Sequence, residues 1–202
     1  MHREVILTPE KAKAVTNAIK KLFILCCVLT AATVYAQVAP SVTGGGSSLW
    51  VGGEYANFVP DYGAANLNGI GASFDFNVTR KIGVIGEGRW LRWASNNGDT
   101  GETQSDYLAG GKYRFFRYQK FDFNAKFLLG GVWIRFPDDI GSGSYFAYAP
   151  GAFVDYHINS RFLARGGYEY QILPTAPNIP GFPSNGLTPH GFSVGVEYVV
   201  LR

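Results

Sequence analysis

The sequence predicts an all-β fold, an eight-stranded antiparallel up-and-down β-barrel, and three observations support this prediction. Glycine and aromatic residues are abundant, whereas charged residues make up only 16% of the chain. Eight segments alternate polar and apolar residues with a period of two, and none has the period of an amphipathic helix. The connections between these segments alternate between long and short. A length of 202 residues is consistent with one such domain.

The eight predicted strands are each long enough to cross a membrane as part of a barrel. They span residues 49–57, 67–77, 81–93, 106–116, 121–134, 145–157, 161–173 and 188–201. No segment approaches the roughly 18 consecutive apolar residues of a membrane helix. Strands are therefore the only elements of the predicted domain that could cross a membrane.

The connections fall into two groups by length. Short ones are predicted at 78–80, 117–120 and 158–160, and long ones at 58–66, 94–105, 135–144 and 174–187. Because the strands are even in number and run up and down, all long connections meet at one end. Both termini are then expected at the other end, with the short turns.

The N-terminal segment has the pattern of a secretory signal peptide. The pair Lys20-Lys21 precedes a short apolar core over 22–29, and Val34-Tyr35-Ala36 fits a cleavage site. We expect residues 1–36 to be a signal peptide that is cleaved after Ala36, and 37–202 to form the barrel domain. The alternative, an uncleaved anchor, is disfavoured because a spanning helix needs about 20 apolar residues.

The net charge of +3 comes from this leader. Beyond Ala36 the chain carries thirteen Lys plus Arg and thirteen Asp plus Glu, so the barrel domain is formally neutral. A nucleic-acid partner is therefore not expected. Both cysteines, Cys26 and Cys27, also lie in the leader, and the barrel domain can form no disulfide.

Within the strands, charged residues share one face and aromatic residues the other. Glu87 and Arg89, two residues apart, lie on the same side of a pleated strand, whereas Trp90 lies on the opposite side. The same parity predicts a network of acids and bases on one face of the sheet. Its members are Glu54, Asp75, Glu87, Arg89, Lys112, Arg114, Lys126, Asp155, Arg165, Glu169 and Glu197.

Two features predict that the charged face points inward and the apolar face outward. Aromatic rings recur near the predicted strand ends, as in the aromatic girdles of transmembrane barrels. The predicted network is nearly balanced in charge, which suits a narrow lumen where buried ions must pair. We therefore expect a transmembrane barrel in a bacterial outer membrane, with short periplasmic turns, periplasmic termini and four longer extracellular loops. The alternative is a soluble lipocalin-like ligand-binding barrel with the faces reversed.

Three stretches carry a resemblance to a known family. They are the segments 106–115 (DYLAGGKYRF) and 149–156 (APGAFVDY), and the final segment 191–198 (GFSVGVEY). On these residues the chain from Ser47 to Arg202 resembles the OmpA/OmpX-like eight-stranded outer-membrane barrels, in particular the outer membrane protein beta-barrel domain family. The resemblance implies outer-membrane lipids and the barrel-assembly machinery as partners.

The last strand is similar to the signal that the assembly machinery recognises. Gly195, Tyr198 and Val200 carry that likeness. The strand departs from the pattern because it ends in Leu201-Arg202 rather than in an aromatic residue.

No catalytic motif, cofactor site or metal site is apparent. A lipid-modifying barrel enzyme needs a serine or histidine with partners, but His190 and Ser193 are three positions apart and point to opposite faces. An enzyme is therefore not expected.

Three hypotheses for function remain open. The inward charges pair among themselves and fill the lumen, which leaves a structural role. Alternatively, pair exchange opens a narrow porin-like path for small ions, with Glu87, Arg89, Lys112 and Arg114 as the gate. In the third hypothesis the loops bind an extracellular partner, and the candidates are the acidic loop 96–105 and the Pro-rich loop 174–187 that contains Phe182.

Overall fold

The computed structural model describes residues 47–61, 66–93, 101–137, 140–178 and 185–202. The expected signal peptide and the tips of the four long loops lie outside the described residues. The described chain forms eight strands: β1 (Ser48–Val59), β2 (Leu67–Asn77), β3 (Ile82–Arg92), β4 (Thr103–Tyr118), β5 (Phe121–Arg135), β6 (Ser142–His157), β7 (Phe162–Tyr170) and β8 (His190–Leu201).

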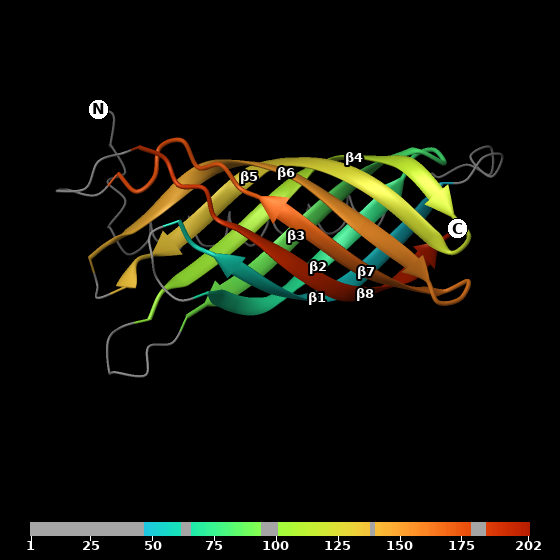
Figure 1. Ribbon diagram of the computed structural model, residues 1–202, viewed down its shortest axis with the longest axis horizontal. Coiled ribbons are helices and arrows are strands. Elements are labelled where there is room, and N and C mark those ends of the chain that lie inside the picture. The colour runs from blue at the N-terminus through green and yellow to red at the C-terminus, as the bar shows by residue number, and fades with distance from the viewer. Residues whose placement is uncertain (1–46, 62–65, 94–100, 138–139, 179–184) are drawn as a thin grey trace, which may run out of the picture. The chain divides into compact units, whose positions relative to one another are not determined.

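The strands close into one antiparallel barrel (Figure 1). Each strand pairs with the next along the chain, and β1 pairs with β8 from Leu49↔Leu201 to Val59↔His190. Every strand is therefore hydrogen-bonded to a neighbour on both sides, and such closure is the condition for a sheet to cross a membrane. The predicted fold class is confirmed.

The two ends of the barrel differ in their connections. The short-turn end carries the links 78–81, 119–120 and 158–161, together with the start of β1 and the end of β8. Two of these turns are fixed by side chains: Thr79 Oγ1 accepts hydrogen bonds from the amides of Lys81 and Ile82, and Asn159 does the same for residues 161 and 162. The opposite, long-loop end carries the other four connections.

Three strands differ from the sequence prediction by three residues at one end, and the bounds of the other five agree with it within two residues. β4 and β6 each begin three residues earlier, at Thr103 and Ser142. Their first residues are polar and lie in predicted loops, but they pair with the end of β5, as in Thr103↔Arg135 and Arg135↔Ser142. β7 ends at Tyr170 rather than 173, because the chain then leaves β8 and makes only isolated bridges.

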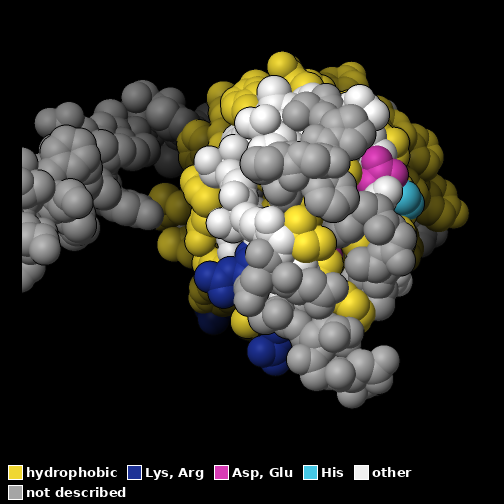
Figure 2. Space-filling view, turned by 90° about the vertical axis from the view of Figure 1, so that its left-hand side faces the viewer, with side chains coloured by type: hydrophobic (Ala, Val, Ile, Leu, Met, Phe, Trp, Pro, Cys, Tyr) yellow, Lys and Arg dark blue, Asp and Glu magenta, His cyan; other side chains and the backbone are white. Residues whose placement is uncertain are grey.

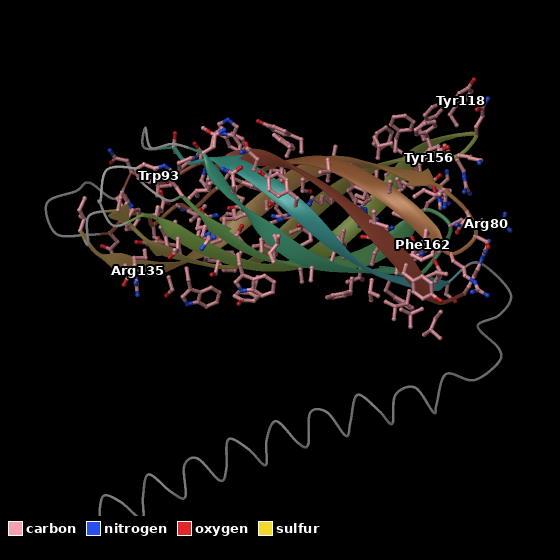
Figure 3. The ribbon with its side chains drawn as sticks, turned by 90° about the horizontal axis from the view of Figure 1, so that it is seen from below. Arg80, Trp93, Tyr118, Arg135, Tyr156 and Phe162 are labelled. Atoms are coloured by element: carbon pink, nitrogen blue, oxygen red, sulfur yellow. The ribbon has the colours of Figure 1, made fainter. Side chains whose placement is uncertain are left out.

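The outward face is apolar and the inward face polar, as predicted from the aromatic rings near the strand ends. Outward side chains such as Ile70 (67% exposed) and Phe115 (58% exposed) are open to the surroundings, whereas Arg89 and Asp106 inside are at most 1% exposed. Rings and basic residues mark both ends of the barrel, with Arg135 at the long-loop end and Arg80, Tyr118, Tyr156 and Phe162 at the short-turn end (Figure 3). A soluble lipocalin-like barrel would have the reverse arrangement.

Among the described residues, no helix has the length and apolarity needed to cross a membrane.

Candidate functional site

The lumen is the candidate site because it collects the buried charges. All eleven residues of the predicted network lie on the inward face, and ten of them are buried. The exception is Arg114, which is half-buried. The side chains form two cation-centred clusters and one group at the short-turn mouth.

The first cluster is built around Arg89 on β3. Its guanidinium donates to Glu54 on β1 (Nε to Oε1, 2.7 Å), to Glu169 on β7 (Nη1 to Oε1, 2.8 Å) and to Glu87 on its own strand. Lys126 on β5 completes the cluster, since its Nζ lies 2.6 Å from Glu87 and 2.7 Å from Glu169. Two cations therefore tie four strands together across the lumen.

The second cluster lies closer to the short-turn end and is built around Arg165 on β7. This guanidinium contacts Asp155 (2.7 Å), Asp75 (2.6 Å) and Glu197 (2.7 Å), which come from three other strands. Lys112 Nζ lies 2.6 Å from the same Asp75 oxygen. Phe153 supports both cations: its ring centroid is 4.1 Å from the Arg165 guanidinium and 5.8 Å from Lys112 Nζ.

Asp122, which the sequence prediction missed, contacts three basic side chains at the short-turn mouth of the barrel. It accepts from Arg114 (2.9 Å) and lies 2.9 Å from both Arg117 and the ring of His157. Asp122 has the same strand parity as Lys126, so the alternation could have found it. Arg114 thus belongs to this half-open group and not to the buried gate that was hypothesised with Glu87, Arg89 and Lys112.

Inward glycines make room for the long side chains of the clusters. A Cβ on Gly71 would lie 3.0 Å from both the Arg89 stem and Glu54 Oε1. At Gly151 a Cβ would lie 3.0 Å from Lys126 Cε and closer still to a backbone oxygen of β7. The glycine-rich inward face is therefore a packing requirement of the ion pairs.

A layer of amides covers the first cluster on the long-loop side. Gln171 Nε2 donates to Asp106 (2.9 Å) and to Glu169 (3.1 Å), and Gln104 Nε2 donates to Asp106 (2.8 Å) and to Gln171 (3.1 Å). Asp106 and Gln104 were not among the predicted site residues, although both share the parity of Lys112. Asp106 is the first residue of the predicted strand 106–116, and Gln104 lies in the predicted loop 94–105.

Glu102 lies above this layer, just before β4. Its side chain is fully buried, and neither carboxylate oxygen has a hydrogen-bond partner among the described residues. Burial raises the pKa of Glu102 from 4.5 to about 7. The group is therefore partly protonated near neutral pH.

The predicted balance of charge in the lumen is wrong. Nine acids but only four cations are buried in the described chain. The cations are Arg89, Lys112, Lys126 and Arg165, and the acids are Glu54, Asp75, Glu87, Glu102, Asp106, Asp122, Asp155, Glu169 and Glu197. The prediction omitted three of these acids and counted Arg114 as buried. The acid excess explains why each buried arginine contacts three carboxylates.

Apolar side chains fill the lumen at the long-loop end. Val132, Ile134 and Phe136 continue the inward face of β5, and they belong to one cluster with Leu173 and Leu187 from the β7–β8 connection. Backbone hydrogen bonds of 2.8 and 3.0 Å join residues 173 and 187. This connection therefore packs into the barrel mouth instead of standing away from it.

The remaining residues singled out in the sequence lie on β8, on both of its faces. Gly195 faces inward against Glu54, whereas Tyr198 and Val200 face outward, with the Tyr198 ring 5.2 Å from that of Phe162. His190 stacks on Tyr170, with ring centroids 5.6 Å apart, while Ser193 is buried in the lumen. Within the described part of the chain, no group of His, Cys, Asp and Glu side chains could hold a metal ion.

Replacing Arg89 by Ala should strongly destabilise the barrel, because three buried carboxylates lose their shared cation. We expect a loss of about 3–5 kcal/mol in the free energy of unfolding. Arg114→Ala is the matched control, since Arg114 contacts one acid and is partly exposed, and it should cost at most about 1 kcal/mol. Urea unfolding in lipid vesicles, followed by tryptophan fluorescence, measures both. Equal losses would contradict the assigned role of Arg89.

Glu102→Gln should remove a pH dependence of stability. The folded-state pKa of about 7 lies above the ordinary value of 4.5, so the folded chain binds a proton that the unfolded chain releases in this interval. Stability therefore falls as pH rises from about 4.5 to about 7, by about 1–3 kcal/mol. The glutamine variant should lack this fall and be the more stable protein above neutral pH. Urea unfolding at several pH values provides the test, and identical pH profiles would contradict it.

Comparison with known proteins agrees with this architecture. A family model described as the outer membrane protein beta-barrel domain matches residues 24–199. Among solved structures, Neisserial surface protein A superposes with a TM-score of 0.56 at 12% identity, covering 76% of this chain and 98% of that one. OprG from Pseudomonas aeruginosa gives 0.52 at 14% identity, covering 78% and 98%.

Ail of Yersinia pestis gives a TM-score of 0.48 at 18% identity, covering 77% of this chain and 98% of that one. No curated protein matches the sequence significantly. At these identities the solved structures show the fold alone, whereas the family model spans most of the chain. The chain belongs to the outer membrane protein beta-barrel domain family and is a bacterial outer-membrane protein.

Proposed function

We propose that this protein is a non-conducting and non-catalytic barrel that holds its long loops at the cell surface, where they bind an extracellular partner. The observation that carries the proposal is the filled lumen. Eight strands enclose only enough space for side chains, and here the two clusters around Arg89 and Arg165 follow one another along the axis. The apolar layer of Val132, Ile134 and Leu173 lies beyond them.

The orientation follows from the lengths of the connections. Outer-membrane barrels carry short turns on the periplasmic side and longer loops outside. The turns 78–81, 119–120 and 158–161 are then periplasmic, together with both termini. This orientation is also the one in which the last strand, with Gly195, Tyr198 and Val200, meets the barrel-assembly machinery from the periplasm.

The long-loop end supports a role in surface interaction. The β7–β8 connection is the longest, and its two branches are fixed at the barrel mouth by the 173–187 pair and by the Tyr145 hydroxyl, which donates to the Pro177 carbonyl (2.9 Å). Loops held by a rigid scaffold are the usual carriers of recognition. The connection between β3 and β4 is the second candidate.

Two arrangements argue against catalysis and nucleic-acid binding. His190 and Ser193, which a lipid-modifying site on β8 would have to bring together, lie on opposite faces of this strand. In the described part of the chain, the exposed basic residues lie at the two rims of the barrel, as expected for contacts with lipid headgroups, and they form no continuous groove for a polyanion.

A cation channel is the second candidate function, and the acid excess of the lumen favours it. Nine buried acids against four buried cations would attract small cations and repel anions if the pairs exchanged. The bridging of each arginine to three acids opposes such exchange, because moving one pair leaves a buried charge without its partner.

The proposal predicts an electrically silent protein. Inserted into planar bilayers, the wild type should show no discrete conductance steps. Arg114→Ala should also show none, because the buried clusters around Arg89 and Arg165 stay intact. Steps that are selective for cations would establish the second candidate and contradict the filled lumen.

The surface role is tested on the same protein in cells. Replacing residues 179–184 by a Gly-Ser linker should abolish binding to cells or extracellular matrix while leaving the heat-modifiable gel migration of the folded barrel unchanged. Unchanged binding would contradict the role assigned to this loop.

A further inference from the structure

Two arginines lie at the same level of the outward face near the long-loop end, on β3 and β5. The register pairs Arg92 on β3 with Thr103 on β4, and Thr103 with Arg135 on β5. Their backbones are thus two strand spacings apart, about 10 Å. Both side chains are exposed, and neither has an ion-pair partner among the described residues. Two guanidinium groups at this spacing can approach one anionic headgroup together.

An aromatic cluster lies directly below them on the same three strands. Trp90 on β3 donates its indole N–H to the Tyr107 hydroxyl on β4 (3.0 Å). The Tyr107 ring meets Trp90 and Trp133 edge-on, with centroid distances of 6.1 and 5.5 Å. All three rings are about half exposed. Such amphipathic rings favour the boundary between headgroups and acyl chains.

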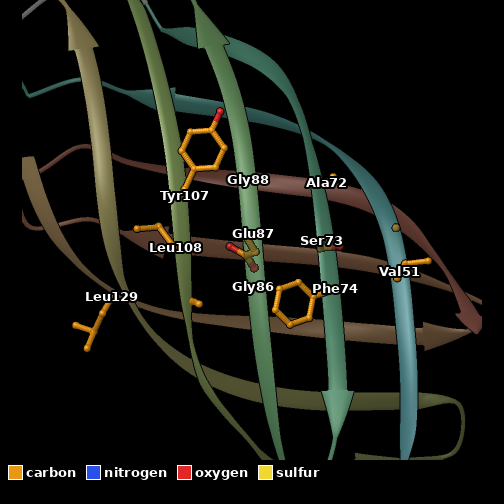
Figure 4. Close-up of a pocket in the computed structure, with 12 residues that line it drawn as sticks. Val51, Ala72, Ser73, Phe74, Gly86, Glu87, Gly88, Tyr107, Leu108 and Leu129 are labelled. Atoms are coloured by element: carbon orange, nitrogen blue, oxygen red, sulfur yellow. The ribbon is translucent and has the colours of Figure 1, made fainter. Parts of the chain in front are cut away.

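A groove of about 640 Å³ continues from this cluster toward the middle of the barrel wall. Its floor is formed by small residues, among them Ala72, Gly86, Gly88 and Ala109, and its sides by larger side chains that include Tyr107. In Figure 4 the rings of Tyr107 and Phe74 stand on either side of the Gly86–Gly88 stretch of β3. Tyr107 therefore belongs both to the aromatic cluster and to the groove, which makes them one continuous surface.

The charges around this surface suit an anion. The residues that align with Arg92 and Arg135 across the rim are polar and uncharged, namely Asn57, Asn68, Thr103 and Ser142. No acidic side chain faces outward in the described long-loop halves of β2 to β5. In the view of this end in Figure 2, the visible basic side chains gather on one side of the rim, opposite the visible acidic one.

We propose that this surface binds a phosphorylated glycolipid of the outer leaflet. Arg92 and Arg135 bind its phosphate through charge-assisted hydrogen bonds. Trp90, Tyr107 and Trp133 pack below the sugar, and an acyl chain lies in the groove over Gly86 and Gly88. The choice of leaflet rests on the proposed orientation, in which the long-loop end faces the cell exterior.

Other occupants fit the surface less well. A zwitterionic phospholipid presents a phosphate but also a cation that the two arginines repel. A purely apolar ligand leaves both guanidinium groups unused, and the same holds for a second copy of the barrel that packs through the groove alone. The continuous series of cations, rings and groove matches a lipid with an anionic sugar headgroup.

The test uses native mass spectrometry of the folded protein in detergent with added bis-phosphorylated lipid A. We expect retention of one lipid molecule, and R92Q together with R135Q should lower retention at least about tenfold, because charge-assisted hydrogen bonds are lost. The matched control is R80Q together with R161Q, which removes the same charge at the opposite end and should leave retention unchanged. Ala109→Phe fills the groove with an apolar ring and should also lower retention, while the heat-modifiable gel migration verifies folding.

Several outcomes would overturn the proposal. Equal retention of dephosphorylated lipid A would show that the arginines do not select phosphate. Equal retention of phosphatidylglycerol in competition would show that the sugar is not recognised, and equal losses in both double variants would remove the site. Binding in detergent does not depend on orientation. Protease accessibility of the long loops on intact cells tests that separately, so failure of the proposed function is distinguishable from failure of this site.

Discussion

The pairing of buried charge inside the barrel is the constraint on which the rest of the structure depends. Once the apolar faces of all eight strands point outward, every acid of the opposite parity must lie in the lumen. A buried carboxylate without a partner costs several kcal/mol. Arg89 and Arg165 meet this demand by bridging three acids each. The glycines at 71 and 151 follow from the same demand, since a side chain there would collide with the bridging groups.

The barrel domain is formally neutral, but its acids are mostly buried in the lumen and its bases are mostly exposed. Beyond Ala36 acids and bases are equal in number, yet nine acids and only four bases are buried in the described chain. The surplus bases therefore stand outside, at the rims, where Arg80 and Arg161 mark one end and Arg92 and Arg135 the other. Lipid headgroups are the anions available there. Because acids and bases are equal in number, the excess of acids in the lumen requires the excess of bases at the rims.

Much of this arrangement could be predicted from the sequence because a strand has a period of two. Parity alone placed Glu87, Arg89 and nine further charges on one face, and the spacing of the turns set the number of strands. Asp106 and Asp122 obey the same parity but stand near strand ends, where boundaries are least certain from sequence. Glu102 lies in the predicted loop 94–105. Omission of these acids produced the mistaken expectation of a balanced lumen.

Other features depend on register and could not be predicted. The proximity of Trp90, Tyr107 and Trp133 requires the alignment of three strands, which the local pattern does not specify. The early end of β7 depends on packing of Leu173 against residues of distant strands, not on its own segment. The sequence likewise contains no local signal that Arg114 reaches Asp122 at the mouth instead of the buried clusters.

The most direct measurement of the central claim is a nitroxide scan along β4 in lipid bilayers. Residues 37–202 contain no cysteine, so single cysteines can be introduced for labelling. Labels at 107, 109 and 111 should be readily accessible to oxygen dissolved in the bilayer, and labels at 108, 110 and 112 should not, because the latter face the packed lumen. A reversed alternation, or equal accessibility at neighbouring positions, would contradict a barrel with its rings in hydrocarbon and its charges paired around the axis.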